Sequence, residues 1–474
     1  MTYFFETYGC QMNTAESAAL DLVCRERGWK TAPDGESADL VLLNTCSVRA
    51  TAEQRVMGRL GFYGALKKSR NAQKRPLTLV VAGCMAERLG EKLKAQAPAV
   101  DYVMGTSARS IFPLILEAVE KGIKAEQNPG FGFDAEKPVF SFSSSHLEEV
   151  PGESPLRSFV PIMHGCNNFC SYCIVPYVRG REISRNPAAI LEEIRLLAER
   201  GVREITLLGQ NVNTYHWEGG DFLRKSLGLP AEVHEKPLDF PNLLRLIAAE
   251  LEQGPGGSPS GIRWVRFLSA NPRDFSRETI RVMAEHPCFC RHLHLCVQHG
   301  SNRILAAMNR RYTREAYLEL AVEIRAAMPG ITLSTDILVG FPGETRADLE
   351  ETLDLMEEVK FLYSYMYHYN PREGTAAYDL PGRIGEEVKR ERLARVIALQ
   401  KQHTQELLKS RLGSREIVLI EGISRKNADE LITRTERDEM AVVRGKASMI
   451  GSFAELTLSG LRGNTFRAAA LKRS

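Results

Sequence analysis

Cys166, Cys170 and Cys173 form a C-x3-C-x2-C motif, the feature of this sequence best suited to chemistry. An apolar run at 159–163 precedes them and predicts a strand, so the loop after it can point three thiols at one centre. A structural zinc normally takes four protein ligands, and no fourth Cys follows nearby. Thiolates also hold iron–sulfur clusters. Three thiolates on such a cluster leave one iron open for chemistry.

With an aromatic residue before its last Cys, this motif resembles that of the radical S-adenosylmethionine (SAM) enzymes, whose open iron is chelated by SAM. The resemblance extends over three further segments: Ile174-Val-Pro-Tyr-Val-Arg-Gly-Arg-Glu-Ile-Ser-Arg185, Leu207-Leu-Gly-Gln-Asn-Val-Asn213 and Asp336-Ile-Leu-Val-Gly-Phe-Pro-Gly-Glu344. Together they resemble the methylthiotransferase family, and within it the tRNA-modifying branch.

The composition is that of an ordinary globular protein. The 474 residues suit two to four domains, and 43% are hydrophobic and 26% charged. The N-terminus has no basic region or cleavage site, and no apolar run approaches the roughly 18 residues that cross a bilayer. We therefore expect a cytoplasmic protein with no membrane partner. Its ten Cys residues are then not expected to form structural disulfides, and metal or redox chemistry is expected for those that lie in spaced motifs.

The first part of the chain alternates strands and helices. The predicted strands lie at 3–7, 40–43, 77–82 and 100–104. Continuous apolar strands separated by helices are typical of a parallel sheet buried on both faces. Cys10, Cys46 and Cys84 each follow one of the first three strands. Because parallel strands end at the same edge, where ligands bind in open α/β sheets, we predict that these thiols hold a second cluster.

The segments around these cysteines also resemble the methylthiotransferases. Tyr8-Gly-Cys-Gln-Met-Asn13, Asn44-Thr-Cys-Ser-Val-Arg49 and Gly83-Cys84 match the N-terminal module of that family. The alternative is that the three thiols are small buried residues at strand ends, since free Cys is often found in cores. The same placement three times argues against that alternative.

Six strand-then-helix units lie beyond a segment at 129–155 whose Gly, Ser and Pro content is typical of a linker. The predicted strands lie at 159–163, 204–209, 263–268, 292–298, 332–339 and 361–369. Six units fall short of an eight-stranded barrel. A partial barrel with its catalytic edge at the C-terminal strand ends is what the radical SAM resemblance implies. Residues 217–240 look like an insertion, to which we assign no function.

A long helix at 386–411 and several short strands end the chain. The predicted strands lie at 416–420, 430–433, 440–443 and 453–458, spaced as in a small antiparallel barrel. This part resembles the TRAM domain, an RNA-binding β-barrel attached to the family. Residues 413–474 carry eleven Lys and Arg against eight Asp and Glu, which equals the whole net charge of +3 and favours a polyanionic partner. The predicted RNA contacts are Arg425, Lys426, Arg434, Arg437, Arg444 and Lys446.

The predicted fold class is therefore α/β, in five parts. These are an N-terminal methylthiotransferase domain (1–128), a linker (129–155), a radical SAM partial (β/α)6 barrel (156–382), a connecting helix (383–412) and a TRAM barrel (413–474).

The resemblance implies radical chemistry at C2 of an adenine, whose C–H bond is not acidic enough for acid–base substitution. It implies that a 4Fe-4S cluster on the C-x3-C-x2-C motif reduces SAM. A second 4Fe-4S cluster, on the three strand-end cysteines, would hold the sulfur to be transferred. By the same analogy SAM is held by polar residues at or near strand ends, namely Gln210, Asn211, Ser269, Gln298 and Asp336. The alternative for each is a buried, hydrogen-bonded polar group that serves the barrel.

One stretch departs from the family pattern. Where the family has His-Leu-Pro-Val-Gln-Ser-Gly-Ser, this chain reads His294-Leu-Cys-Val-Gln-His-Gly-Ser301, so Cys296 and His299 replace Pro and Ser. A third metal site made by Cys296 with Cys288 and Cys290 is conceivable. Core or surface thiols are the better interpretation.

Residues beside the cluster cysteines favour one substrate. Segments 11–13, 44–49 and 208–212 resemble the branch that acts on N6-isopentenyladenosine at position 37 of tRNA, giving 2-methylthio-N6-isopentenyladenosine. That base would be turned out of the anticodon-loop stack. Three alternatives stay open: the threonylcarbamoyl-adenosine branch, the branch acting on an aspartate of a ribosomal protein, and a zinc-bound RNA-binding protein without catalysis. We further expect a monomer and an electron donor such as flavodoxin or ferredoxin; the sulfur donor is not predicted.

Overall fold

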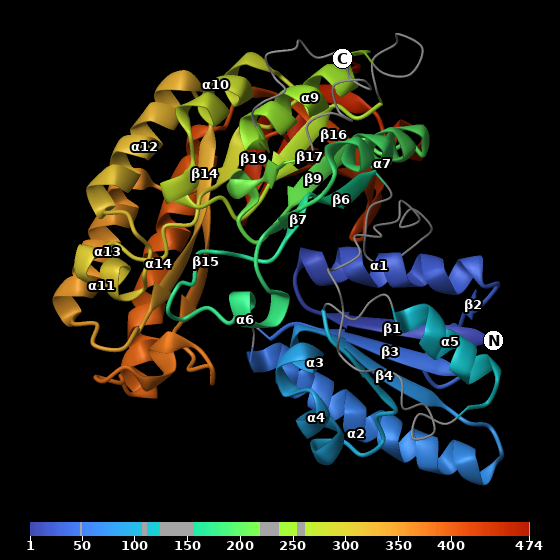
Figure 1. Cartoon of the computed structure of the whole chain (residues 1–474). Helices are drawn as coiled ribbons and strands as arrows, with labels where there is room; N and C mark the ends of the chain where they lie inside the picture. Colours follow the sequence, from blue (N-terminus) through green and yellow to red (C-terminus); the bar gives the residue numbers. More distant parts are fainter. Residues whose placement is uncertain (48–49, 107–110, 124–155, 219–236, 254–260, 474) are drawn as a thin grey trace. The chain divides into compact units, whose positions relative to one another are not determined.

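The computed structural model describes residues 1–47, 50–106, 111–123, 156–218, 237–253 and 261–473 (Figure 1). The predicted linker and most of the predicted insertion lie outside these residues. The chain divides into two compact units. The first comprises residues 1–148, 164–167 and 173–183, and the second comprises 149–163, 168–172 and 184–474. Among the described helices, none has the length and apolar character needed to cross a membrane.

The first unit is built on a five-stranded sheet in the order β2-β1-β3-β4-β5, and all its strand pairs are parallel. The strands are β1 (Thr2–Tyr8), β2 (Lys30–Thr31), β3 (Leu40–Thr45), β4 (Thr78–Gly83) and β5 (Tyr102–Met104). The predicted parallel sheet is confirmed, with strand ends shifted by one or two residues. Strand β2 was not predicted because its two exposed residues give no apolar signal.

Helices cover both faces of this sheet (Figure 1). They are α1 (Gln11–Glu26), α2 (Ala50–Ala72), α3 (Cys84–Leu89), α4 (Glu91–Gln96) and α5 (Phe112–Glu120). Val41 and Leu43 belong to the core with α2 and α3, whereas Leu40 and Leu42 belong to the core with α1 and α5. Since successive side chains of a strand point to opposite faces, the continuous apolar run fills both cores.

The second unit begins with a partial barrel of six parallel strands. These are β6 (Arg157–Pro161), β9 (Glu204–Leu208), β12 (Trp264–Phe267), β13 (His292–His294), β14 (Thr332–Val339) and β15 (Tyr363–His368). They form two sheets, in the orders β12-β9-β6 and β13-β14-β15, and single bridges such as Ala270 to Leu295 continue the pairing from the first sheet to the second. The predicted six-unit open barrel is confirmed.

Helices lie outside the strands of this barrel (Figure 1). They are α7 (Pro187–Glu199), α9 (Phe240–Gln253), α10 (Arg277–Glu285), α11 (Asn302–Ala307), α12 (Arg314–Ala327), α13 (Arg346–Val359) and α14 (Glu386–Ser410). The remaining short elements are α6 (Val175–Arg179), which belongs to the first unit, β10 (His216–Trp217) and β11 (Leu238–Asp239), which belong to the second, and β7 (Met163–His164) and β8 (Ile183–Ser184), whose residues are divided between the two units.

The C-terminal strands close into a barrel in the order β16-β17-β18-β20-β19. They are β16 (Arg415–Ser424), β17 (Asn427–Thr435), β18 (Met440–Arg444), β19 (Phe453–Arg462) and β20 (Thr465–Arg473). A closed barrel with an odd number of strands cannot be antiparallel throughout, and β18 and β20 pair in parallel. The predicted small antiparallel barrel is confirmed except at this pair, which the prediction did not include. Strand β20 was not predicted because its centre, Ala468-Ala469-Ala470, has weak strand propensity.

This C-terminal barrel closes the end of the central barrel where the strands begin. The hydroxyl of Tyr363, the first residue of β15, donates to Asp438 Oδ2 over 3.1 Å. Arg266 of β12 donates to the carbonyls of Thr435 and Glu436 over 3.0 and 2.7 Å. The opposite end of the central barrel, where strands β6 to β15 finish, is therefore the end at which a catalytic site is expected.

Asp438 is a carboxylate at the contact between the two barrels. Its Oδ1 accepts a hydrogen bond from Arg434 over 2.7 Å. Burial alone would raise the pKa of Asp438, but the charges of Arg266 and Arg434 outweigh it and hold that pKa well below its usual range.

Because its folded-state pKa is depressed, Asp438 stabilises the fold above its unfolded pKa of about 3.9, and this contribution is lost as the pH falls through the folded value. We expect Asp438→Asn to lower the free energy of unfolding of the second unit by about 3 kcal/mol at pH 7. The difference in the free energy of unfolding between this variant and wild type should become smaller below about pH 4. Urea unfolding at several pH values measures this difference. Asp429→Asn, at an exposed position, is the control; equal loss at all pH values would contradict this role.

Candidate functional site

The strand-end cysteines of the first unit lie at one edge of its sheet. The register aligns Tyr8 with Thr45 and Thr45 with Gly83, so β1, β3 and β4 finish side by side. Cys46 and Cys84 come directly after these ends. Cys10 follows Tyr8 after one residue, and the Cys46 amide donates to the Tyr8 carbonyl over 2.9 Å. The topology therefore gathers the three thiols from three adjacent loops.

Two buried asparagines fix these loops. Asn13 Nδ2 donates to Asn44 Oδ1 over 3.0 Å, and Asn44 Nδ2 donates back to the Asn13 carbonyl over 2.9 Å. Asn13 Oδ1 also accepts from the Cys10 amide over 3.2 Å. Gly83 has φ of +92°, and a Cβ there would lie 2.5 Å from Asn44 Oδ1. Only glycine therefore suits the turn that delivers Cys84.

A buried ion pair lies beside these thiols within the same unit. Arg179 Nη1 is 2.6 Å from Glu16 Oε1, and the two side chains are 2% and 3% exposed. A hydrogen bond with Cys46, helped by the charge of Arg179, lowers the pKa of Cys10 to about 6 although burial opposes it. The thiolate is the form that binds metals. Burial instead raises the pKa of Cys84.

Helix α6 carries this arginine and packs on the sheet edge. Ile174 and Val178 form an apolar cluster with Cys84, and the Val178 carbonyl accepts a hydrogen bond from Thr106. Arg179 Nη2 is buried and has no hydrogen-bond partner among the described residues. An unsatisfied cationic donor beside thiols suits an anionic group bound there. The sequence motif contains Arg179, but its spacing did not reveal this role.

The C-x3-C-x2-C loop is held by backbone contacts. In the first unit, Gly165 has φ of +77°, and a Cβ there would lie 2.0 Å from the Arg181 carbonyl oxygen. The Cys166 amide donates to the Gly180 carbonyl over 3.1 Å. In the second unit, Ser171 donates from its amide to Met308 over 3.0 Å. Cys166 is thus fixed within the first unit, and Ser171 within the second.

Arg310 is a buried contact of Cys170 that the sequence did not suggest. Its Nη1 donates to Cys170 Sγ over 3.3 Å, and its Nη2 donates to the Cys296 carbonyl over 2.7 Å. Arg310 thus fixes the position of the Cys170 sulfur and ties it to the backbone at Cys296. The residues on either side, Asn309 and Arg311, have φ of +57° and +60°. This backbone conformation is uncommon outside glycine.

Three of the five predicted SAM contacts lie together in the second unit. Gln298 Nε2 donates to Asp336 Oδ2 over 3.4 Å, and the Ser269 amide donates to His294 Nδ1 over 3.1 Å. His294 Nε2 is in turn 3.6 Å from Asp336 Oδ2. Ser269 and Gln298 have φ of +64° and +72°. Strained backbone of this kind is often found at functional sites.

The other two predicted SAM contacts form a separate group. Asn211 Nδ2 donates to Asp274 Oδ2 over 3.0 Å. Gln210 Oε1 and Asn211 Oδ1 are buried without a hydrogen-bond partner among the described residues. Two unsatisfied acceptors after β9 fit a ligand that carries donors, as the ammonium group of SAM does.

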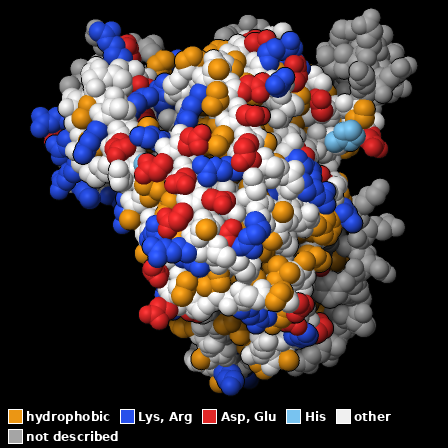
Figure 2. Space-filling view, turned by 90° about the vertical axis from the view of Figure 1, so that its left-hand side faces the viewer, with side chains coloured by type: hydrophobic (Ala, Val, Ile, Leu, Met, Phe, Trp, Pro, Cys, Tyr) orange, Lys and Arg blue, Asp and Glu red, His pale blue; other side chains and the backbone are white. Residues whose placement is uncertain are grey.

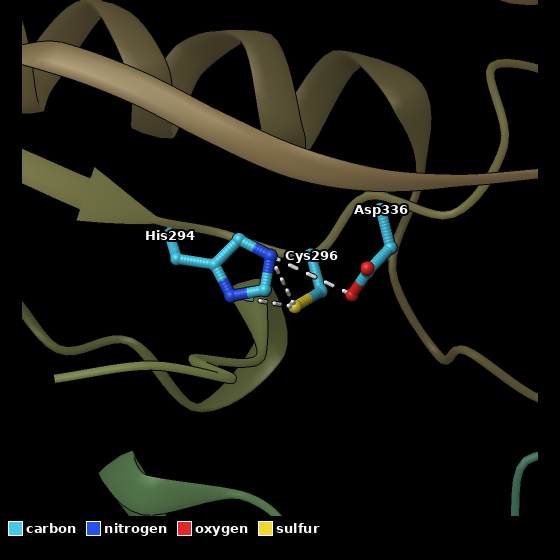
Figure 3. Close-up of side chains that lie close together, drawn as sticks. All are labelled: His294, Cys296 and Asp336. Carbon is cyan, nitrogen blue, oxygen red and sulfur yellow. Dashed lines mark hydrogen bonds and ion pairs between the residues drawn. The ribbon is translucent and has the colours of Figure 1, made fainter. Parts of the chain in front are cut away.

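His294, Cys296 and Asp336 offer ligand atoms within 4.8 Å of one another, the only such His, Cys, Asp or Glu trio in the described ranges (Figure 3). Burial lowers the pKa of His294 and raises that of Cys296. Because Nδ1 of the neutral ring accepts from Ser269, its hydrogen lies on Nε2, toward Asp336. This trio is therefore a hydrogen-bonded group rather than a ligand set. Cys288 and Cys290 lie outside it.

The predicted RNA contacts fall into two groups. Arg434 pairs with Glu421 and Asp438 over 2.8 and 2.7 Å, and Arg437 pairs with Glu416 over 2.8 Å, so their charges are already balanced. The remaining four are exposed on the turns at the ends of β16 and β18: Arg425, Lys426, Arg444 and Lys446. In Figure 2, basic and acidic side chains are interspersed over the central part of the face, while Lys and Arg side chains gather at its upper left edge.

Two parts of the chain match known protein families, and its fold matches that of a solved structure. Residues 160–356 match the radical SAM superfamily, and residues 2–105 match the uncharacterized protein family UPF0004. A radical SAM methyltransferase from Kitasatospora setae, solved with cobalamin and a [4Fe-4S] cluster, superposes with a TM-score of 0.53. It is 16% identical and covers 80% of this chain and 77% of its own, so it shows the fold alone.

Relatives of known name are similar over nearly the whole chain. The tRNA-2-methylthio-N(6)-dimethylallyladenosine synthase of Treponema denticola is 48% identical and that of Geobacter sulfurreducens 42% identical. The first alignment covers 99% of both chains, and the second covers 96% of this chain and 94% of the relative. The chain therefore belongs to the tRNA-2-methylthio-N(6)-dimethylallyladenosine synthase family of radical SAM proteins.

Proposed function

We propose that this protein inserts a methylthio group at C2 of N6-isopentenyladenosine at position 37 of tRNA. The observation that carries the proposal is the gathering of Cys10, Cys46 and Cys84 at the ends of three adjacent strands, in a chain that also has the C-x3-C-x2-C motif. One trio suffices for radical SAM chemistry. A second trio supports a second cluster that holds the group to be transferred.

The cofactors of this proposal are SAM and two 4Fe-4S clusters. Cys166, Cys170 and Cys173 would hold one cluster, and the strand-end trio would hold the other. When bound, these groups would supply one-electron reduction of SAM and a transferable sulfur. The donor set fits, because thiolates are the ligands such clusters take and each trio offers three of them.

The chain's own residues bind and orient these groups. Arg179, which is paired with Glu16 through Nη1, offers its Nη2 donor to a group bound at the strand-end trio, and Arg310 donates to Cys170. Gln210 and Asn211 offer unsatisfied acceptors to SAM. Cys46, Cys84, Cys166 and Cys170 are buried, which keeps water from the reacting groups.

The proposed partners follow from the same reaction. The exposed basic residues of the C-terminal barrel, Arg425, Lys426, Arg444 and Lys446, would contact the tRNA phosphates. An electron donor such as flavodoxin or ferredoxin would reduce the cluster of the C-x3-C-x2-C motif. We propose that the protein acts as a monomer.

The test is anaerobic reconstitution with iron, sulfide, SAM, reductant and isopentenylated tRNA, followed by nucleoside mass spectrometry. We expect 2-methylthio-N6-isopentenyladenosine. The absence of methylthio product with both clusters loaded would reject the proposal. A product on threonylcarbamoylated tRNA, or on an aspartate of a ribosomal protein, would assign the chain to another branch.

A further inference from the structure

Strand β15 carries a row of tyrosines on one face. Tyr363, Tyr365 and Tyr367 alternate with residues of the opposite face, where Ser364 donates to Gln400 of α14 over 2.6 Å. Because successive side chains of a strand point to opposite faces, the tyrosines point away from α14. The register aligns Tyr365 with Asp336 of β14. The tyrosines therefore share the inner face of the barrel with Asp336.

Both ends of this row are closed by protein. At the start of β15, the ring of Tyr363 stacks on His292 with centroids 5.0 Å apart, and its hydroxyl bonds Asp438. Beyond the end of β15, Tyr369 is buried in an apolar cluster against which Tyr172 packs. Between these ends, Tyr365 and Tyr367 are each 39% exposed. Two aromatic rings of the inner face are thus each more than a third exposed to solvent.

These rings lie close to the proposed radical centre. The ring of Tyr365 meets the edge of His294 with centroids 5.5 Å apart. His294 is 3.8 Å from Cys296 Sγ, and Arg310 bridges the Cys296 carbonyl and Cys170 Sγ. A short chain of direct contacts thus leads from Tyr365 to a proposed cluster ligand. A molecule on the rings would lie near the site where SAM is reduced.

A base that has left its helical stack loses its stacking partners, and enzymes acting on such bases replace them with aromatic side chains. We propose that Tyr365 and Tyr367 form the platform on which the purine ring of the substrate nucleotide stacks. This inference rests on the proposed function and names the residues that hold the base. Each base–aromatic stack is worth roughly tenfold in affinity. The adenine of SAM offers the same planar surface, so the test must separate the two sources.

The experiment uses the reconstituted full-length protein and two synthetic anticodon stem-loops. One carries N6-isopentenyladenosine at position 37, and the other is abasic there. Fluorescence anisotropy should show that wild type binds the base-bearing loop at least about tenfold more tightly. Tyr365→Ala/Tyr367→Ala should lose most of this preference yet bind the abasic loop as wild type does. Tyr365→Phe/Tyr367→Phe should keep the preference, because the aromatic ring remains.

Phe62→Ala, which removes an aromatic ring 41% exposed on α2, is the matched control and should keep the preference. Equilibrium dialysis with labelled SAM should give the same affinity in all variants. An alanine pair that weakens SAM binding and keeps the base preference would assign the platform to SAM and overturn the proposal. A wild type that binds both loops equally would also overturn it. Failure of wild type to bind either loop would instead reject the proposed function itself.

Discussion

Replacing Cys84 with alanine is expected to halve the iron content and abolish methylthio transfer while SAM cleavage continues. The expectation follows from the division of roles between the two trios. The strand-end trio would lose a ligand, so iron should fall from about eight to about four per chain. The C-x3-C-x2-C motif is unchanged, so 5′-deoxyadenosine should still form from SAM.

The matched control is Cys24→Ala. Cys24 is fully buried on α1 but lies in the apolar core rather than at a strand end, so its loss should cost stability and leave the iron unchanged. Iron and sulfide analysis measures the first effect, and mass spectrometry of nucleosides and 5′-deoxyadenosine measures the second. Persistence of the methylthio product in Cys84→Ala would contradict the assignment. Loss of 5′-deoxyadenosine would show that the two sites are not separate.

The second large effect is expected at the buried pair of Arg179 and Glu16. Removing one partner leaves the other charge buried and uncompensated, which typically costs about 3–5 kcal/mol. Glu16→Met and Arg179→Met should therefore each destabilise the first unit by about that amount. Replacing both by methionine removes both charges, so the loss should be well below the sum of the single losses.

Hydrogen exchange of peptides from α1 measures the stability of this unit without assuming that the whole chain unfolds in one step. Glu117→Met is the control. It removes an exposed pair with Lys121, and such pairs contribute less than about 1 kcal/mol. Losses that simply add in the double variant would contradict a coupled buried pair.

Much of the architecture follows from local sequence. The apolar runs of β3 and β4 predict central strands because their side chains fill cores on both faces. The placement of Cys10, Cys46 and Cys84 after strands then predicts a shared edge without any knowledge of side-chain contacts. Strands β2 and β20 were not predicted, because β2 is exposed and β20 is rich in alanine, so neither has a clear apolar pattern.

The partners of the cysteines could not be predicted in this way. Arg179 meets Glu16 across 163 positions of sequence, and Arg310 meets Cys170 across 140. No local periodicity encodes contacts of this range. The same holds for Arg434 and Arg437, whose basic character suggested phosphate binding but whose charges are balanced by Glu421 and Glu416. The sequence shows which residues are basic, but only the folded structure shows which of them pair with acidic side chains.

The most direct test of the account is the iron content of the anaerobically purified and reconstituted protein, with Mössbauer spectra of the enriched sample. Two three-cysteine sites, each holding a four-iron cluster, predict about eight irons per chain and spectra of the 4Fe-4S type alone. About four irons per chain, or zinc in place of the second cluster, would contradict the central claim that the strand-end cysteines hold a cluster of their own.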